Sequence, residues 1–258
     1  MTFRSLAIAC GFAVFLMYGG LIVSLLYFVH GPSFLQVLLS DRTVYSLVLS
    51  LLTASVVTVG AVAVALPAAY ALSRYRFPGR RLVDAILELP MIVSPVALGA
   101  MILIFFSTPA GALLQERGGY VIFTVYGIVL AQFVTTAGVA TRLIKTVFDD
   151  IPRRYEELAW TLGASEAKGF LTVVIPMGRR GIVSAAIITW AKALGEFGAT
   201  ITVAGSMAFH TETLPIAIFM RLAQADIEGA AVLVLILITI GLAVLFGVRA
   251  FTGRGAYV

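Results

Sequence analysis

The sequence contains very little of the chemistry from which metal sites and most active sites are built. Its 258 residues include one cysteine, Cys10, and two histidines, His30 and His210. A single cysteine excludes a disulfide within the chain and a thiolate metal cluster. Two isolated histidines are more often surface residues than metal ligands, and neither falls inside an apolar segment. We therefore expect no metal site and no catalytic residues in this chain.

Charged residues are also scarce. Only 12% of the residues are charged, whereas 60% are hydrophobic. A soluble domain does not carry that balance, so the composition indicates an integral membrane protein. The apolar segments lack the alternation of apolar and polar residues that is typical of barrel strands. The spanning elements are therefore predicted to be helices.

Six apolar segments approach the roughly 20 residues that a spanning helix needs. They are Leu6–Val29, Val44–Ser73, Pro90–Phe106, Val121–Phe148, Gly181–Gly205 and Gly229–Arg249. The first could instead be a signal peptide, but its length and the lack of a small-residue cleavage pattern favour a retained helix. Pro90 and Pro95 leave the start of the third segment undefined. The apolar stretches Phe34–Leu39 and Leu214–Met220 are too short to cross and are expected to be interfacial or re-entrant. We predict an all-α polytopic membrane protein with six transmembrane helices in a single domain, residues 1–258.

The net charge of +5 results from cations that are unevenly distributed between alternate connections. One set of connections, with the residues after the last helix, holds Arg74, Arg76, Arg80, Arg81, Arg142, Lys145, Arg153, Arg154, Lys168, Arg179, Arg180, Arg249 and Arg254. The other set holds only Arg42, Arg117 and Arg221. Because cytoplasmic loops carry the excess of Lys and Arg, both termini and the central loop are predicted to be cytoplasmic. We interpret the basic balance as a topology signal rather than as a site for nucleic acid or anionic lipid.

An amphipathic segment, at about residues 149–180, interrupts the apolar sequence between the fourth and fifth predicted helices. Tyr155, Leu158, Ala159 and Leu162 fall at positions i, i+3, i+4 and i+7, which places them on one face of a helix. Gly163 provides a stop for that helix, and Pro176 is expected to bound a second short one. The segment could lie on lipid headgroups or in a groove of a partner protein. Its polar side is acidic as well as basic, which favours the protein groove.

The same segment resembles the coupling loop of permease subunits of ATP-binding-cassette importers. The resemblance lies in Glu157-Leu-Ala159, Gly163 and Val173-Val-Ile-Pro176, at the family's spacing, with Leu158 in place of the family's middle alanine. It implies a type I importer permease fold, with a coupling helix that docks in a groove of a cytosolic ATPase. Tyr155, Leu158, Ala159, Leu162 and Gly163 would then fit that groove, and Glu157 would hold the shape of the loop or pair with a basic group. The resemblance further implies a homodimer, an extracytoplasmic binding protein, and ATP–Mg bound by the partner ATPase rather than by this chain.

Two charged residues fall inside the predicted fifth helix. If that helix is continuous, Lys192 and Glu196 lie one turn apart, and Lys192 lies roughly 16 Å from Gly181, near the midplane of the bilayer. An unpaired charge at that depth is costly, so we expect an ion pair between them or a polar pathway. In the second case Glu196, Phe197 and Thr200 would line or gate a translocation route.

This region also resembles the oxyanion branch of importer permeases, which transport molybdate, tungstate or sulfate. The similar residues are Leu194-Gly-Glu-Phe-Gly-Ala199, Ala204-Gly205 and Thr213-Leu-Pro215. The resemblance implies a permease for molybdate or tungstate, with sulfate or another oxyanion as the alternative. Ser94 and Thr136 are further candidates for the pathway, although serine and threonine in membrane helices commonly hydrogen-bond their own helix.

Two other classes of membrane protein fit the sequence less well. A self-contained secondary transporter usually shows an inverted repeat and several membrane-buried ion ligands, and neither is evident. An intramembrane enzyme needs a nucleophile–base pair or a metal site, and the apolar segments contain no histidine that could serve in either. The chain also lacks a Gly-rich phosphate loop ending in Gly-Lys-Ser/Thr, so it cannot hydrolyse ATP alone.

Overall fold

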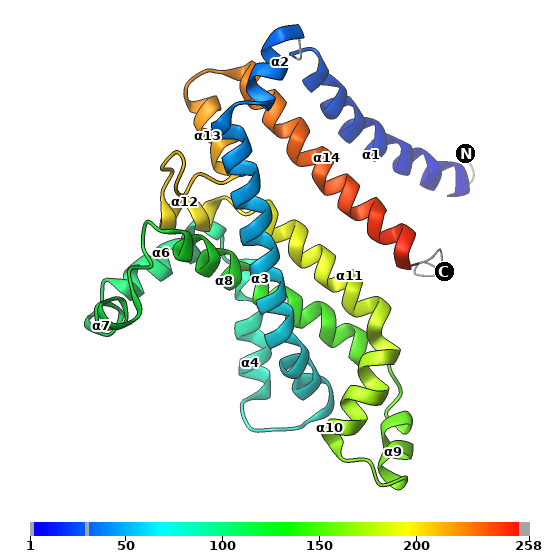
Figure 1. The fold of residues 1–258 in the computed structure, drawn as a ribbon. Helices are drawn as coiled ribbons and strands as arrows, with labels where there is room; N and C mark the ends of the chain where they lie inside the picture. The colour runs from blue at the N-terminus through cyan, green and yellow to red at the C-terminus, as the bar shows by residue number, and fades with distance from the viewer. Residues whose placement is uncertain (1–2, 29–30, 253–258) are drawn as a thin grey trace.

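The structure is a computed structural model that describes residues 3–28 and 31–252, and every regular element in these ranges is helical (Figure 1). The helices are α1 (Phe3–Leu26), α2 (Gly31–Leu38), α3 (Asp41–Arg74), α4 (Arg80–Leu87), α5 (Leu89–Ile92), α6 (Pro95–Phe106), α7 (Pro109–Gly118), α8 (Val125–Asp149), α9 (Arg154–Thr161), α10 (Glu166–Gly169), α11 (Ile175–Leu194), α12 (Gly198–Ala204), α13 (Leu214–Ala223) and α14 (Ile227–Thr252). A π-helical turn, Phe170–Val174, joins α10 to α11. The prediction of an all-α membrane protein is confirmed.

In the described ranges, five helical segments are long and apolar enough to cross a membrane, and a sixth span results if one bent pair is counted. The pair is Arg80–Ile92 followed by Pro95–Phe106, with a bend of 116° between them. The third predicted segment, Pro90–Phe106, whose start the sequence left undefined, therefore contains this bend, and α6 begins at Pro95. Proline disfavours the helical conformation in the residue before it, so Ser94 is extended and its side chain caps α6 by accepting the N–H of Ala97.

The predicted fifth helix, Gly181–Gly205, is wrong at both ends. The structure has one continuous helical segment from Glu166 to Leu194, so Pro176 does not bound a separate short helix. A π-turn accommodates the proline, since the N–H of Ile175 donates to the carbonyl of Phe170, five residues earlier. At the other end the segment stops at Leu194, and the chain resumes as the separate helix α12.

Three helices, α3, α8 and α11, pack together at the centre of the chain. Their largest buried cluster combines small residues of α3, including Ala61 and Ala65, with Ile144 and Phe148 of α8. Small side chains let membrane helices approach closely, and dispersion contacts then stabilise the packing. Gly99 shows the same principle between α6 and α12, because a Cβ at Gly99 would lie 2.8 Å from the Cβ of Thr202.

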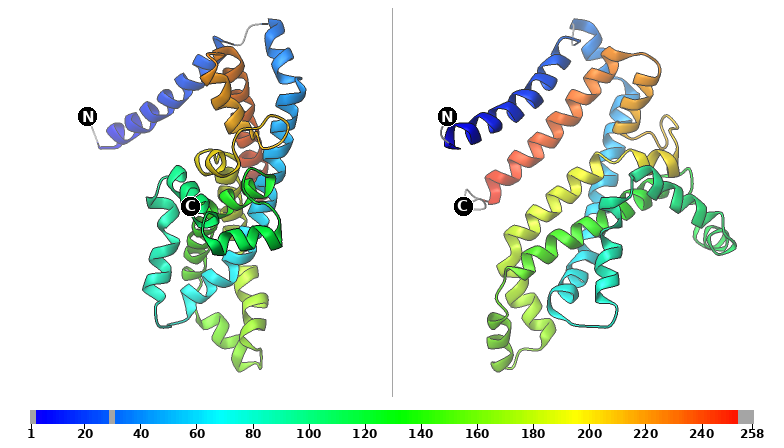
Figure 2. Two further views of the ribbon diagram at one scale, coloured as in Figure 1. Left: turned by 90° about the vertical axis from the view of Figure 1, so that its left-hand side faces the viewer. Right: turned by 180° about the vertical axis from the view of Figure 1, so that it is seen from behind.

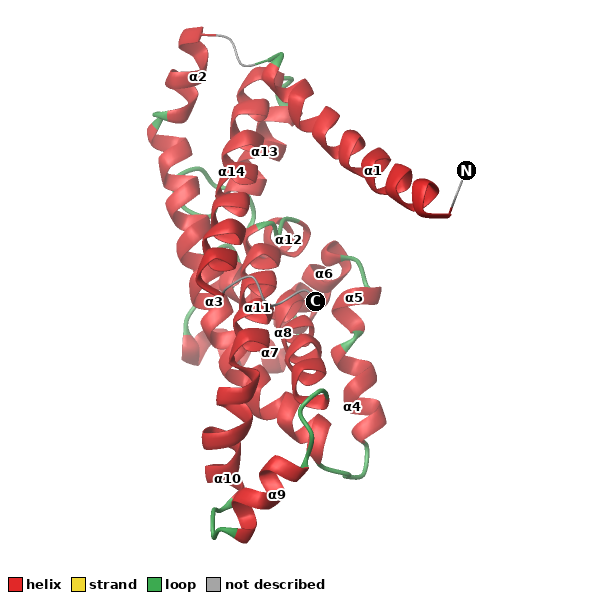
Figure 3. Ribbon diagram, turned by 90° about the vertical axis from the view of Figure 1, so that its right-hand side faces the viewer, coloured by secondary structure: helices red, strands yellow, loops and turns green. Residues whose placement is uncertain are grey.

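The remaining helices extend the molecule at its two ends and along one side. Helix α1 has no buried residue and packs beside α14 (Figures 1 and 2). The predicted short stretches near Phe34 and Leu214 are confirmed as helices, α2 and α13, and both lie at one end of the molecule. Helices α9 and α10 lie at the opposite end (Figure 3). This end carries the amphipathic segment that the sequence singled out.

Candidate functional site

Helix α9 presents an uncovered apolar face at the tip of the molecule. Leu158 is 59% exposed and Leu162 is 89% exposed, and Tyr155 is also exposed. Ala159 is half-buried. The predicted helix therefore exists, and the face that the periodicity indicated is not covered by the described part of this chain. An apolar face without a cover is the form that a docking surface takes before its partner binds.

Gly163 ends this helix by taking a left-handed conformation, with φ of 86°. Its N–H donates to the carbonyl of Trp160, and the next N–H, of Ala164, donates to that of Ala159. Ser165 then caps the following helix by accepting the N–H of Lys168 at 3.3 Å. The predicted helix stop at Gly163 is confirmed. The two helices and the tight turn between them form a compact projection.

The projection is held to the body of the protein by Glu156. This carboxylate is 1% exposed, and its Oε1 lies 2.7 Å from Nε of Arg74, the last residue of α3. Its Oε2 accepts a 2.6 Å hydrogen bond from the hydroxyl of Tyr70. The family resemblance implied that Glu157 could hold the shape of this loop, but the side chain of Glu157 is exposed. Glu156 was missed because its partners lie about 80 residues earlier, and the position of Arg74 was already explained as a topology signal.

Further polar contacts tie the same projection to the end of α3. The guanidinium of Arg153 donates to the carbonyls of Ser73 at 3.1 Å and Arg74 at 2.6 Å. The hydroxyl of Tyr75 donates to Oε2 of Glu166 at 2.8 Å, and this hydrogen bond to a carboxylate raises the pKa of Tyr75. Contacts on both flanks of α9, through Arg153 before it and Glu166 after it, therefore hold the projection against the end of α3.

A second feature lies where α11 ends and α12 begins. Lys192 is in the last turn of α11, and Glu196 lies in the break that follows. The expected ion pair is not formed in the described part of the chain. Glu196 is buried instead, and its Oε1 accepts the N–H of Ala199 at 2.9 Å, at the start of α12. The expectation fails because it assumed a continuous helix, whereas the chain breaks at Gly195.

Lys192 and Glu196 both line an open hollow of about 490 Å³, formed where this break faces the bend before α6. The hollow is lined by Pro95, Val96, Ala191, Lys192, Gly195, Glu196, Phe197 and Gly198. Leu194 packs in a cluster with Ala54 and Val57, near the middle of the 34-residue helix α3. The hollow therefore lies near the middle of the molecule along α3.

The sequence-predicted pathway residues separate into three groups. Glu196 and Phe197 line the hollow. Thr136 and Thr200 are fully buried and do not line it, and the hydroxyl of Thr136 donates to the carbonyl of Gln132 in its own helix. Ser94 lies beside the hollow, with its hydroxyl oxygen used to cap α6.

A buried carboxylate also lies at the other end of α3. Glu212 is completely buried and accepts two hydrogen bonds, each of 2.7 Å, from Nε and a terminal nitrogen of Arg42. This bidentate pair joins the second residue of α3 to the segment that precedes α13. In the sequence analysis, Arg42 was only one of the few cations in the connections predicted to lie outside the cytoplasm. The two residues are 170 positions apart, so the sequence carries no local signal of their contact.

Comparison with known proteins places these features in a family context. Residues 61–254 match the family described as binding-protein-dependent transport system inner membrane component. The chain is 31% identical over 221 residues to the sulfate transport system permease protein CysT of Escherichia coli, covering 85% of this chain and 80% of that protein. It is also 31% identical over 250 residues to a probable molybdenum ABC transporter permease protein of Haloferax volcanii, covering 96% and 90%.

The fold of the chain is similar to that of a solved bacterial alginate ABC transporter, crystallised in complex with an alginate-bound periplasmic protein. The TM-score is 0.78, with 99% of this chain and 96% of that chain covered. The sequence identity is 15%, so this likeness concerns the fold alone.

Proposed function

This chain belongs to the family of binding-protein-dependent transport system inner membrane components, and we propose on that premise that it forms the membrane pathway of an oxyanion importer. As a member of that family it is a permease subunit of an ABC transporter and is not itself catalytic. The observation that supports an ATPase-driven importer is the uncovered apolar face of α9, held at the tip of the molecule by Glu156. The oxyanion part of the proposal rests on the sulfate and molybdenum permeases among the relatives.

We infer that this face docks in a groove of a cytosolic ATPase, which binds ATP and Mg²⁺. Leu158 and Leu162 would supply the apolar contacts, and Gly163 would allow the tight turn beside them. ATP binding would draw the two ATPase subunits together and move α9 with them. Because α9 is attached to α3 through Arg74, that movement would act directly on a spanning helix.

The pathway itself is proposed to form between two copies of this chain, with both termini in the cytoplasm. An extracytoplasmic binding protein would deliver the substrate to the opposite side. The substrate is proposed to be molybdate or tungstate, in line with the relative of Haloferax volcanii, with sulfate as the alternative in line with CysT. All three are small tetrahedral dianions, and selection among them can reside in the binding protein.

Lys192 is the residue of the hollow that is suited to meet a dianion. Glu196 faces the same hollow, but its carboxylate is already bound by the N–H of Ala199. The ammonium of Lys192 forms no ion pair in the described part of the chain. A transient contact with the anion would lower the barrier to passage without creating a tight site, which conduction requires.

Replacing Lys192 by methionine is expected to lower the maximal rate of oxyanion uptake by about tenfold or more, because a hydrogen bond to a charged group contributes about 1.5–3 kcal/mol. Lys192→Arg, which keeps the charge, should retain most of the rate. Uptake is measured in proteoliposomes that contain the complete transporter. Equal loss in both variants, or no loss in Lys192→Met, would contradict a role for the charge.

The proposed function is tested by reconstituting the permease with its ATPase and its binding protein. ATP hydrolysis is compared with the binding protein empty or loaded with molybdate, tungstate or sulfate. We expect one or more of the three oxyanions to stimulate hydrolysis and to accumulate in the vesicles. If none of them does so while the complex is intact, the oxyanion assignment is wrong.

A further inference from the structure

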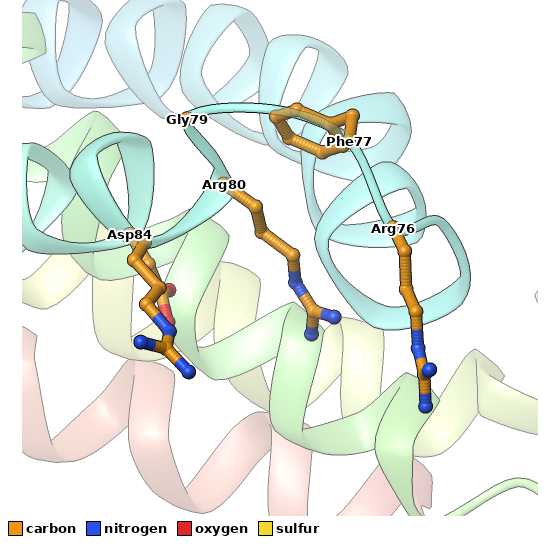
Figure 4. Close-up of a pocket in the computed structure, with 6 residues that line it drawn as sticks. Arg76, Phe77, Gly79, Arg80 and Asp84 are labelled. Carbon is orange, nitrogen blue, oxygen red and sulfur yellow. The ribbon is translucent and has the colours of Figure 1, made fainter.

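Three arginines line one open hollow at the turn between α3 and α4. The hollow measures about 500 Å³ and is lined by Arg76, Phe77, Gly79, Arg80, Arg81 and Asp84. Gly79 takes a left-handed conformation, with φ of 81°, which lets the chain reverse tightly between the two helices. Figure 4 shows that the side chains of Arg76 and Arg80 leave this turn toward the same side. Their guanidinium groups therefore face a common space.

These guanidinium groups have no acidic partner in the described part of the chain. Asp84 also faces the hollow, but its Oδ1 lies 3.4 Å from a guanidinium nitrogen of Arg142, which pairs with Glu88 as well. Neighbouring cations at this end are also engaged by the protein, Arg74 with Glu156 and Lys145 with Asp149. The hollow thus concentrates positive charge that the fold leaves uncompensated.

The helix that follows the hollow has an uncovered apolar surface. Leu82 is 64% exposed and Ile86 is 52% exposed, and Val83 beside them is also exposed. The turn is set back from the tip formed by α9 and α10 in all views of the molecule (Figures 1 to 3). A cationic hollow beside an apolar surface, at the end of a spanning helix, is complementary to a phospholipid. The arginines suit its phosphate, and the apolar side chains suit its acyl chains.

The sequence alone favoured a topology signal over an anionic-lipid site for these arginines, but it could not show that three of them line one hollow. We propose that the hollow binds the phosphate of an anionic phospholipid on the cytoplasmic side of the membrane, the side that the distribution of cations predicts. Planar guanidinium groups donate paired hydrogen bonds to phosphate oxygens, which suits arginine better than lysine for this task. The acyl chains would lie along Leu82 and Ile86. A free phosphate would use the cationic hollow but would gain nothing from the apolar side chains beside it. The ATPase is the less fitting partner, because α9 extends beyond the turn and would meet a cytosolic protein first.

The test compares two variants of the full chain in detergent. Arg80→Gln/Arg81→Gln removes two cations of the hollow. Arg179→Gln/Arg180→Gln is the matched control, because it removes an adjacent and exposed arginine pair elsewhere on the same predicted side. Both variants should keep the thermal unfolding temperature of the parent in lipid-free detergent. Bound lipid is then measured by native mass spectrometry, with phosphatidylglycerol or phosphatidylcholine added.

The parent and the control are expected to retain phosphatidylglycerol in preference to phosphatidylcholine. The Arg80/Arg81 variant should bind phosphatidylglycerol about 30-fold more weakly, since each basic residue near an anionic surface contributes to the attraction. Equal loss in the control would show a general charge effect and overturn the proposal. So would displacement of the lipid by millimolar inorganic phosphate. Unchanged lipid binding with loss of ATPase co-purification would overturn it as well, and would assign the hollow to the partner protein.

Discussion

Replacing Glu156 by alanine is expected to destabilise the protein by about 3–5 kcal/mol, because it leaves the guanidinium of Arg74 buried without its carboxylate. Arg74 is 8% exposed and Glu156 is 1% exposed, so water cannot replace the lost partner. Tyr70 would lose its acceptor at the same time. The change is measured as a fall in the thermal unfolding temperature of the full chain in detergent. The variant should also fail to co-purify with the ATPase, since α9 loses its attachment to α3.

Two controls separate the ion pair from the loss of a side chain. Glu157→Ala removes the neighbouring carboxylate, which is exposed, and should change stability by about 0.5 kcal/mol or less. Arg74→Met combined with Glu156→Leu removes both charges and should cost less than Glu156→Ala alone. If Glu156→Ala behaves like Glu157→Ala, the buried pair does not hold the projection.

The apolar runs predicted the spanning helices well, whereas the breaks within and between them could not be read from hydrophobicity. Hydropathy reports which residues avoid water, and it is the same for a straight helix and a bent one. The bend before Pro95 depends on the extended conformation of Ser94, which caps α6, and hydropathy does not report this conformation. Pro176 misled in the opposite direction, because a π-turn absorbed a proline that usually ends a helix. A break in the helical segment therefore precedes Pro95, whereas the helical segment continues through Pro176.

The candidate site was predicted where its signal is local and missed where its signal is long-range. The apolar face of α9 follows from a helical period within eight residues, and the structure leaves it uncovered. The pairs Arg74–Glu156 and Arg42–Glu212 join residues far apart in the chain, and no pattern in one sequence links them. The predicted Lys192–Glu196 ion pair is not formed, because the i,i+4 spacing brings two side chains together only in a continuous helix and α11 ends before Gly195.

The two long-range pairs have a common consequence for α3. This helix holds a buried carboxylate near its first residue, through Arg42, and another at its last residue, through Arg74. One carboxylate belongs to the segment before α13 and the other to α9. A single helix, which contains Pro67, therefore connects the two ends of the molecule. We expect a movement of α9 to reach the opposite end through α3, with Pro67 as the position where this helix can bend.

Replacing Leu158 by aspartate is expected to abolish docking of the ATPase and therefore transport, while the permease still folds. Leu158 is 59% exposed in the isolated chain, so a carboxylate there is solvated and costs little stability. In the docked state the same carboxylate would be buried in an apolar groove. The lost burial of leucine alone is about 2 kcal/mol, or about a 30-fold loss of affinity, and the cost of burying a charge adds to it.

Matched variants make this expectation specific to the apolar face. Leu158→Met keeps an apolar side chain of similar volume and should preserve co-purification with the ATPase. Glu157→Gln alters the opposite side of α9 and should preserve it too. Uptake and co-purification are measured together for the three variants, with folding checked by thermal unfolding in detergent. Normal transport by Leu158→Asp would show that α9 is not the surface through which the transporter is driven, because burying an unpaired carboxylate in an apolar groove costs too much free energy for docking to persist.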